Sequence, residues 1–76
     1  MHSLFITYRV DLSGLKFNLA SFEGASLEHS NFEGTKFLHS GFFGAKLANA
    51  NFAAADLPLT EFNLADVTNA SFAGYI

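Results

Sequence analysis

Two histidine–serine pairs, His29-Ser30 and His39-Ser40, are the residues in this sequence whose types most suggest chemistry. A histidine within hydrogen-bond reach of a serine can act as the base that activates a nucleophile, and neighbouring histidines can bind a metal ion. The sequence has no cysteine, so it offers neither a thiolate ligand nor a disulfide. Whether the two pairs perform catalysis or bind a metal therefore depends on the elements that position them.

The composition indicates one small domain with an apolar interior and a sparsely charged surface. Ten of the 76 residues are phenylalanine, and 50% of the residues are hydrophobic. Only 14% are charged, against roughly 25% in a typical soluble domain. Burial in a domain of this size only marginally offsets the loss of chain entropy, so we expect an efficiently packed core.

The charge pattern and the first residues argue against several classes of partner. The net charge is -3, and the four basic residues, Arg9, Lys16, Lys36 and Lys46, are scattered. That pattern argues against a phosphate-binding patch and against direct binding of nucleic acid. Residues 1–9 lack a signal peptide's basic start and an apolar run long enough to cross a membrane. We therefore expect a cytoplasmic protein without a membrane partner.

From residue 10 onward, two apolar or small series recur with a period of five. Neither series contains a charged residue, so together they mark an interior. The second series, mostly of small residues, lies two positions before the first and includes Val10, Leu15, Ala20 and Ala25. The first series is large and apolar and forms the expected structural core: Leu12, Phe17, Phe22, Leu27, Phe32, Phe37, Phe42, Leu47, Phe52, Leu57, Phe62, Val67 and Phe72.

A period of five fits neither a helix nor a flat strand. Successive members of the series would walk around a helix, and on a strand an odd spacing alternates between the two faces. The period fits a solenoid in which each pentapeptide forms one side, with two inward residues, one outward residue between them and a two-residue corner. We expect this repeat domain over residues 10–76. Residues 1–9 are expected to form an N-terminal strand or cap, with Leu4, Phe5 and Ile6 in a short strand.

The expected corners carry residues that favour tight turns. Pairs such as Glu33-Gly34 place glycine where a type II turn requires a positive φ, and Asn49 and Asn69 tolerate the same conformation. The only proline, Pro58, falls at the first central turn position, where its fixed φ is favoured. The turn residues therefore agree with the register of the two series.

This register also places the two histidine–serine pairs. Ser30 and Ser40 point inwards, where we expect them to satisfy backbone groups, whereas His29 and His39 lie on corners at opposite edges of the coil. Neither pair then aligns a base with a nucleophile, and the two histidines cannot share a metal ion. The sequence therefore predicts no catalytic residue, no metal site, no cofactor and no small-molecule substrate.

The repeated unit resembles the motif of the pentapeptide-repeat family, in which a small residue, Asp or Asn, and Leu or Phe precede two variable positions. Residues 50–52, 55–57 and 65–67 match best, and the resemblance extends over residues 10–74. Gly41 and three lysines depart from the usual polar choice. The resemblance implies an all-β fold, a right-handed quadrilateral β-helix with four pentapeptides per coil and about three coils. Residues twenty apart would then stack, with phenylalanine ladders facing each other across the axis.

Several large apolar residues face outwards in this register. They gather at two neighbouring corners, with His39 among them, and the side between these corners carries Ser21, Gly41 and Glu61. Single exposed apolar residues are normal on proteins, but a cluster rimmed by polar residues is typical of a binding surface. The candidate interaction surface consists of Leu19, Leu38, Phe43, Pro58, Leu59 and Leu64.

These patterns predict a non-enzymatic structural or protein-interaction module that binds a protein partner or itself. A solenoid exposes its last coil unless something covers it, so we expect a homodimer with an end-to-end contact through Phe72, Tyr75 and Ile76. The resemblance also implies an alternative, a DNA-mimic modulator of a DNA-processing enzyme such as gyrase. Such mimicry needs a continuous acidic face. The outward rows instead mix single acidic residues with neutral residues and lysines.

Overall fold

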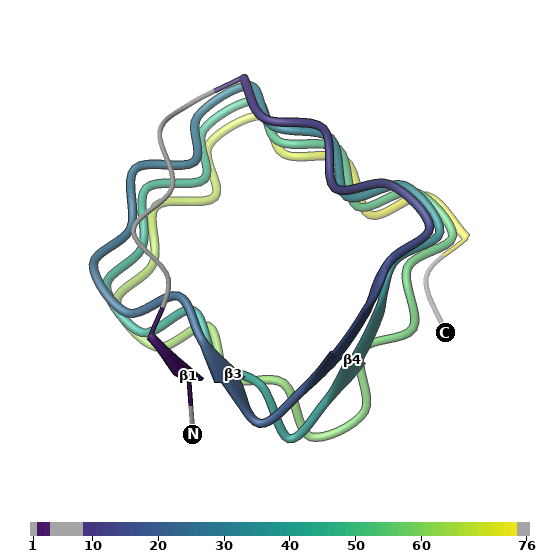
Figure 1. The fold of residues 1–76 in the computed structure, drawn as a ribbon. Coiled ribbons are helices and arrows are strands. Elements are labelled where there is room, and N and C mark those ends of the chain that lie inside the picture. Colours follow the sequence, from purple (N-terminus) through teal and green to yellow (C-terminus); the bar gives the residue numbers. More distant parts are fainter. Residues whose placement is uncertain (1, 4–8, 75–76) are drawn as a thin grey trace.

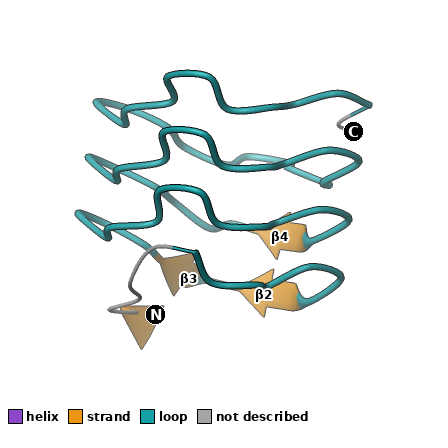
Figure 2. Ribbon diagram, turned by 90° about the horizontal axis from the view of Figure 1, so that it is seen from above, coloured by secondary structure: helices purple, strands orange, loops and turns teal. Residues whose placement is uncertain are grey.

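The computed structural model describes residues 2–3 and 9–74, and the backbone winds around one axis as a right-handed, four-sided β-helix (Figure 1). The short strands in this part are β1 (His2–Ser3), β2 (Lys16–Asn18), β3 (Ala20–Ser21) and β4 (Lys36–Leu38). Isolated β-bridges and turns continue the coils, which lie one above another in Figure 2. Within the described ranges there is no helix long and apolar enough to cross a membrane. The expected all-β solenoid is confirmed.

Residues twenty apart lie side by side on successive coils, so four pentapeptides make one coil. β2 and β4 pair in parallel with Lys16 opposite Lys36. Isolated parallel bridges continue at the same interval, for example between Asn31 and Asn51. The backbone N–H of Asn51 donates to the carbonyl of Ser30 at 2.9 Å. Each coil is therefore held to the next by the hydrogen bonds of a parallel sheet.

Phenylalanine rings fill the interior in two facing ladders. Phe32 stacks on Phe52, and Phe22 stacks on Phe42, each with 4.7 Å between ring centroids. Across the axis, Phe32 and Phe42 meet edge to face at 84° and 5.7 Å. Stacked and edge-to-face pairs of this kind stabilise a core beyond the burial of their area. The fully buried large side chains are Phe22, Leu27, Phe32, Phe37, Phe42, Leu47 and Phe52.

Burial decreases towards both ends of the described solenoid. Val67 is 40% exposed and Leu15 is 47% exposed, although both belong to the series expected inside. The interior position expected for these two residues is therefore wrong. The period correctly gives the direction of a side chain, but burial also requires a coil on each side. For the same reason Leu12, Phe17, Leu57, Phe62 and Phe72 are only half-buried against the core.

The N-terminal strand pairs with the first coil. β1 lies parallel to β3, with His2 opposite Ala20 and Ser3 opposite Ser21. This pairing satisfies part of the edge that the first coil presents. The short strand expected at Leu4, Phe5 and Ile6 lies outside the described residues.

The second residue of each corner has a left-handed backbone conformation. φ is positive at every fifth residue from Arg9 to Gly74, including the glycines and asparagines expected there. The same conformation also occurs at residues that disfavour it, since it costs an ordinary residue roughly 1–2 kcal/mol. The residues in this second group are Arg9, Leu19, His29, His39, Ala54, Leu59 and Leu64.

Interior hydroxyl groups satisfy backbone atoms. The backbone N–H of Val10 donates to Ser30 Oγ at 3.3 Å, and Thr35 Oγ1 donates to the carbonyl of Leu12 at 2.8 Å. In the part of the chain that the structure describes, no buried side-chain nitrogen or oxygen lacks a hydrogen-bond partner. The polar members of the inward series therefore fit the core without the penalty of an unsatisfied group.

Candidate interaction surface

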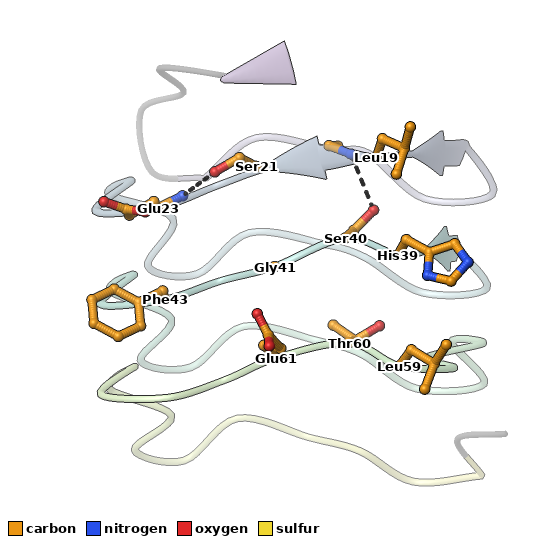
Figure 3. Close-up of a pocket in the computed structure, with 11 residues that line it drawn as sticks. Leu19, Ser21, Glu23, His39, Ser40, Gly41, Phe43, Leu59, Thr60 and Glu61 are labelled. Atoms are coloured by element: carbon orange, nitrogen blue, oxygen red, sulfur yellow. Dashed lines mark hydrogen bonds between the residues drawn. The ribbon is translucent and has the colours of Figure 1, made fainter. Parts of the chain in front are cut away.

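A hollow of about 630 Å³ lies on one side of the solenoid between two columns of corners (Figure 3). We call it the acidic groove. One wall is a column of three corner residues that we call the corner ridge: Leu19, His39 and Leu59. The floor and the opposite wall are formed chiefly by Ser21, Gly41, Glu61, Glu23 and Phe43. The groove is therefore built by stacking the same side of three successive coils.

The floor of the acidic groove is a row of outward residues. Parallel bridges join Ser21 to Gly41 and Gly41 to Glu61. The φ of Gly41 is not positive, and a Cβ placed there would approach only Glu61 Oε1, at 3.9 Å. The backbone therefore does not require glycine at this position. Its missing side chain instead leaves the middle of the floor open.

The corner ridge combines an unfavourable backbone conformation with exposed side chains. φ is 59° at Leu19, 50° at His39 and 54° at Leu59. Leu19 is 49% exposed and Leu59 is 73% exposed. The corners at residues 14, 34 and 74 use glycine, which adopts positive φ without a steric penalty. The ridge thus carries apolar side chains where glycine or asparagine would suit the turn better.

Ser40 holds the backbone next to the corner ridge. Its Oγ accepts a hydrogen bond from the N–H of Ala20 at 3.3 Å and donates to the carbonyl of Leu38 at 3.2 Å. The side chain is 3% exposed. Because the hydroxyl bonds to backbone groups on two successive coils, it fixes the spacing between Leu19 and His39.

The chemistry first suggested by the histidine–serine pairs does not arise from this geometry. His29 and His39 are exposed on corners, whereas Ser30 and Ser40 are buried and bonded to backbone groups. Among the described residues, no group of three or more histidine, cysteine, aspartate or glutamate side chains is placed to hold a metal ion. The two serines therefore act as structural hydrogen-bonding groups.

Two carboxylates give the acidic groove its charge. Glu23 lies on the wall beside Phe43, and Glu61 lies on the floor (Figure 3). The residues of the described chain that line the groove include no lysine or arginine. The groove therefore presents negative charge next to apolar side chains.

The aspartates with shifted pKa values lie outside the groove. The backbone N–H of Ser13, and secondarily its side chain, lower the pKa of Asp11. The hydroxyl of Thr68 donates to Asp66 Oδ1 at 2.6 Å and its N–H donates at 3.0 Å, and these bonds lower the pKa of Asp66. Each aspartate closes a local turn by accepting hydrogen bonds from the residue two positions later. These hydrogen bonds stabilise the corners at Asp11 and Asp66.

The structure divides the predicted interaction surface among three places. Leu19, Phe43 and Leu59 line the acidic groove. Leu38 lies in a second hollow, of about 330 Å³, together with Lys16, Lys36 and Asp56. Leu64, which is 82% exposed, and Pro58 line neither hollow. The six residues therefore do not all line one hollow.

Some residues of the groove were not predicted as site residues from the sequence. Glu23 and Thr60 line the groove with no motif of their own. The signal that identifies Glu23 is the twenty-residue stacking interval, which places it one coil away from Phe43. Of the predicted end contact, Phe72 is half-buried in the last described coil, and Tyr75 and Ile76 lie outside the described residues.

The outward rows do not form an acidic stripe. Parallel β-bridges of the backbone place Lys36 beside Asp56 and Lys46 beside Asp66 on the next coil. The row that begins at Asp11 continues with neutral residues at 31, 51 and 71. Within the described ranges, negative charge is therefore interrupted along each of these rows.

The comparison with protein families and the comparison with solved structures agree with each other. A family model described as pentapeptide repeats matches residues 8–37 and 42–74 in 8 copies. A search of curated proteins gives no match. Among solved structures, the chain is similar to a pentapeptide repeat protein from the thylakoid lumen of Arabidopsis thaliana, with 28% sequence identity and a TM-score of 0.56. That alignment covers 87% of this chain and 57% of the other, so this chain spans little more than half of that neighbour's length.

Proposed function

The chain belongs to the pentapeptide-repeat family, and from this premise we propose that it is a non-enzymatic protein-interaction module that binds through the sides of its solenoid. One observation carries the proposal. Exposed apolar residues occupy outward corners that do not need them, with exposed fractions of 73% at Leu59 and 82% at Leu64. Apolar side chains gathered on a surface and rimmed by polar groups mark sites of protein contact.

The use of the polar side chains supports a non-enzymatic role. The hydroxyls of Ser30 and Ser40 bond to the backbone, and the exposed histidines lie apart from them. A nucleophile needs a base within hydrogen-bond reach and a third group that orients the base. The hydroxyls of both pairs are instead occupied by backbone groups, so binding is the role we assign to the outer surface.

A matched pull-down tests the proposed function. Wild-type protein and a Leu19→Asn/Leu59→Asn/Leu64→Asn variant are immobilised, exposed to the same cell extract and compared by quantitative mass spectrometry. Asparagine tolerates the left-handed corner, so the variant removes apolar surface without straining the turn. We expect the wild type to retain proteins that the variant loses. Equal retention by both proteins and by an empty resin would contradict the proposal.

We also propose that the solenoid self-associates end to end. In the last described coil, Val67 is 40% exposed, and Phe62 and Phe72 are half-buried. A second copy stacked on this coil would cover these side chains and pair its exposed edge. Light scattering should then report a dimer at high micromolar concentration, and a monomeric mass would exclude the end-to-end contact.

The alternative role as a DNA mimic receives less support from the surface. A mimic must reproduce a regular array of negative charge, whereas two outward rows place a lysine beside an aspartate on the neighbouring coil. Gyrase supercoiling assays at micromolar protein would decide this alternative, and we expect no effect. The cytoplasmic location expected from the sequence stays a prediction.

A further inference from the structure

The acidic groove has the size and lining of a site for a short peptide segment. Its volume of about 630 Å³ falls in the range of roughly 300–1,000 Å³ that is typical of binding pockets. Leu19 and Leu59 stand on one wall of the groove and Phe43 stands on the other, so both edges carry apolar side chains (Figure 3). The floor at Gly41 carries no side chain and leaves room between the walls.

The charge of the groove determines what kind of segment fits. Glu23 and Glu61 lie on the wall and the floor, and no lysine or arginine lines the groove within the described chain. An acidic segment would be repelled, whereas lysine or arginine side chains could pair with both carboxylates. Charge complementarity of this type selects partners and speeds their association.

The backbone of the corner ridge supplies a second, independent argument. Leu19, His39 and Leu59 all have positive φ, and none of them is a glycine, asparagine or aspartate. Arg9, His29, Ala54 and Leu64 have the same conformation outside the groove. The ridge differs from them in stacking three such corners on successive coils along one wall of the groove, two of them with exposed leucines. Backbone strain of this kind gathers at ligand-binding sites, where function offsets its effect on stability.

We propose that the acidic groove binds a short extended segment of a partner protein in which large apolar residues alternate with lysine or arginine. This inference rests on the proposed function and specifies the partner's chemistry. Leu19 and Leu59 are two coils apart, about 9.6 Å at the spacing of roughly 4.8 Å between paired strands, which about three extended residues span. The apolar side chains, which point to one side of the extended segment, contact the corner ridge, and the basic side chains on its other side reach Glu23 and Glu61 next to Phe43.

A pair of labelled peptides tests the inference directly. The probe is a fluorescent hexapeptide of alternating leucine and lysine, and its matched control replaces each lysine with glutamate. Fluorescence anisotropy with the full chain should give binding to the lysine peptide that is at least about tenfold tighter than to the glutamate peptide, and that weakens with added salt because the charge pairs are exposed. Equal binding of both peptides would overturn the inference.

Variants locate the binding site on the protein. Glu23→Gln and Glu61→Gln should each weaken binding of the lysine peptide by about threefold, as expected for partly exposed charge pairs. Glu33→Gln changes a carboxylate outside the groove and should leave the affinity unchanged. Leu19→Asn/Leu59→Asn should weaken it by about tenfold while the thermal midpoint does not fall. Equal affinities for the groove variants and their control would place the binding elsewhere and overturn the inference.

The outcomes also separate this inference from the proposed function. If the wild-type protein retains partners in the pull-down but does not bind the lysine peptide, the segment chemistry is wrong and the interaction role stands. If it retains no partner, the proposed function fails as well. A change from dimer to monomer in Leu19→Asn/Leu59→Asn would mean that a second copy occupies the groove, and would overturn the assignment to a partner segment.

Discussion

Two columns of corners turn the chain with the same backbone conformation but carry opposite kinds of residue. The corners at residues 14, 34 and 74 use glycine and the corner at 54 uses alanine, whereas the corner ridge uses Leu19, His39 and Leu59. φ lies between 50° and 72° at all seven positions. The first column therefore carries mostly glycine, which favours the positive φ of the turn, whereas the second column carries residues that disfavour it.

This difference separates what the fold requires from what the surface adds. A Cβ at Gly34 would meet no atom within 4 Å, so space does not explain the choice of glycine. Backbone conformation explains it, because glycine alone adopts positive φ freely. The same reasoning favours glycine or asparagine on the corner ridge, which instead carries two leucines and a histidine.

The largest expected loss of stability comes from a substitution in the apolar core, on which both columns of corners depend. Phe42 is fully buried and stacks on Phe22 at 4.7 Å and on Phe62 at 5.2 Å. Phe42→Ala should destabilise the protein by ~3–5 kcal/mol through the cavity it leaves. Urea denaturation measures this loss. The matched control is Phe43→Ala, because Phe43 is 46% exposed on the groove wall, and similar losses for both variants would contradict the assignment of inside and outside.

An exchange within the glycine column tests the conformational argument. Gly34→Ala should lower the free energy of unfolding by about 1 kcal/mol, because alanine disfavours positive φ. Ala54, with φ of 57°, occupies the equivalent corner one coil later, so Ala54→Gly should raise it by a similar amount. Thermal melts of both variants give the two values. A neutral Gly34→Ala would show that these corners impose no conformational requirement.

Replacing a leucine of the corner ridge with asparagine should raise the free energy of unfolding, whereas replacing a buried apolar residue usually lowers it. Leu59 is 73% exposed, so Leu59→Asn loses little burial and relieves an unfavourable φ. We expect a gain of about 0.5–1 kcal/mol in the free energy of unfolding, since asparagine tolerates the left-handed region. Leu19→Asn should gain less because Leu19 is 49% exposed. A loss of stability in Leu59→Asn would mean that the ridge contributes to folding.

The smallest expected effect is the pH dependence of stability that arises from Asp66 at one polar corner. Hydrogen bonds from Thr68 lower the pKa of Asp66 in the folded protein. The unfolded chain therefore takes up this proton more readily, so the stabilisation is present above about pH 4 and is lost as the pH falls through the folded pKa. Thr68→Ala should raise the pKa of Asp66 in an NMR titration. Asp11, which bonds to Ser13, serves as the internal control and should not change.

The fold follows from the sequence because every coil repeats the same local rule. The large residue at every fifth position gives the inward direction for Phe22, Phe42 and their equivalents, and the glycine corners give the turns. The number of sides came from the family resemblance, since a period of five alone does not state how many pentapeptides close a coil. The rule also fails to give depth of burial, as Val67 shows, because depth depends on neighbouring coils.

The candidate site was only partly predictable. Stacking at twenty residues brings Leu19, His39 and Leu59 into one column, and this could be derived from the sequence once the coil was assumed. The concave floor and the position of Glu23 in the groove depend on how far the side chains of each wall project around Gly41. The five-residue period does not predict this projection. The positive φ of the ridge residues could be predicted from their position in the repeat. That these residues line a groove, unlike the glycine corners, could be seen only in the structure.

The central claim is that the corner ridge serves binding and not folding, and one double variant tests it most directly. Leu19→Asn/Leu59→Asn and the wild type are compared in the same buffer for the free energy of unfolding and for affinity towards the leucine–lysine peptide. We predict a free energy of unfolding at or above that of the wild type, together with about tenfold weaker binding. A variant that is less stable by more than about 1 kcal/mol yet binds the peptide as tightly as the wild type would contradict the claim.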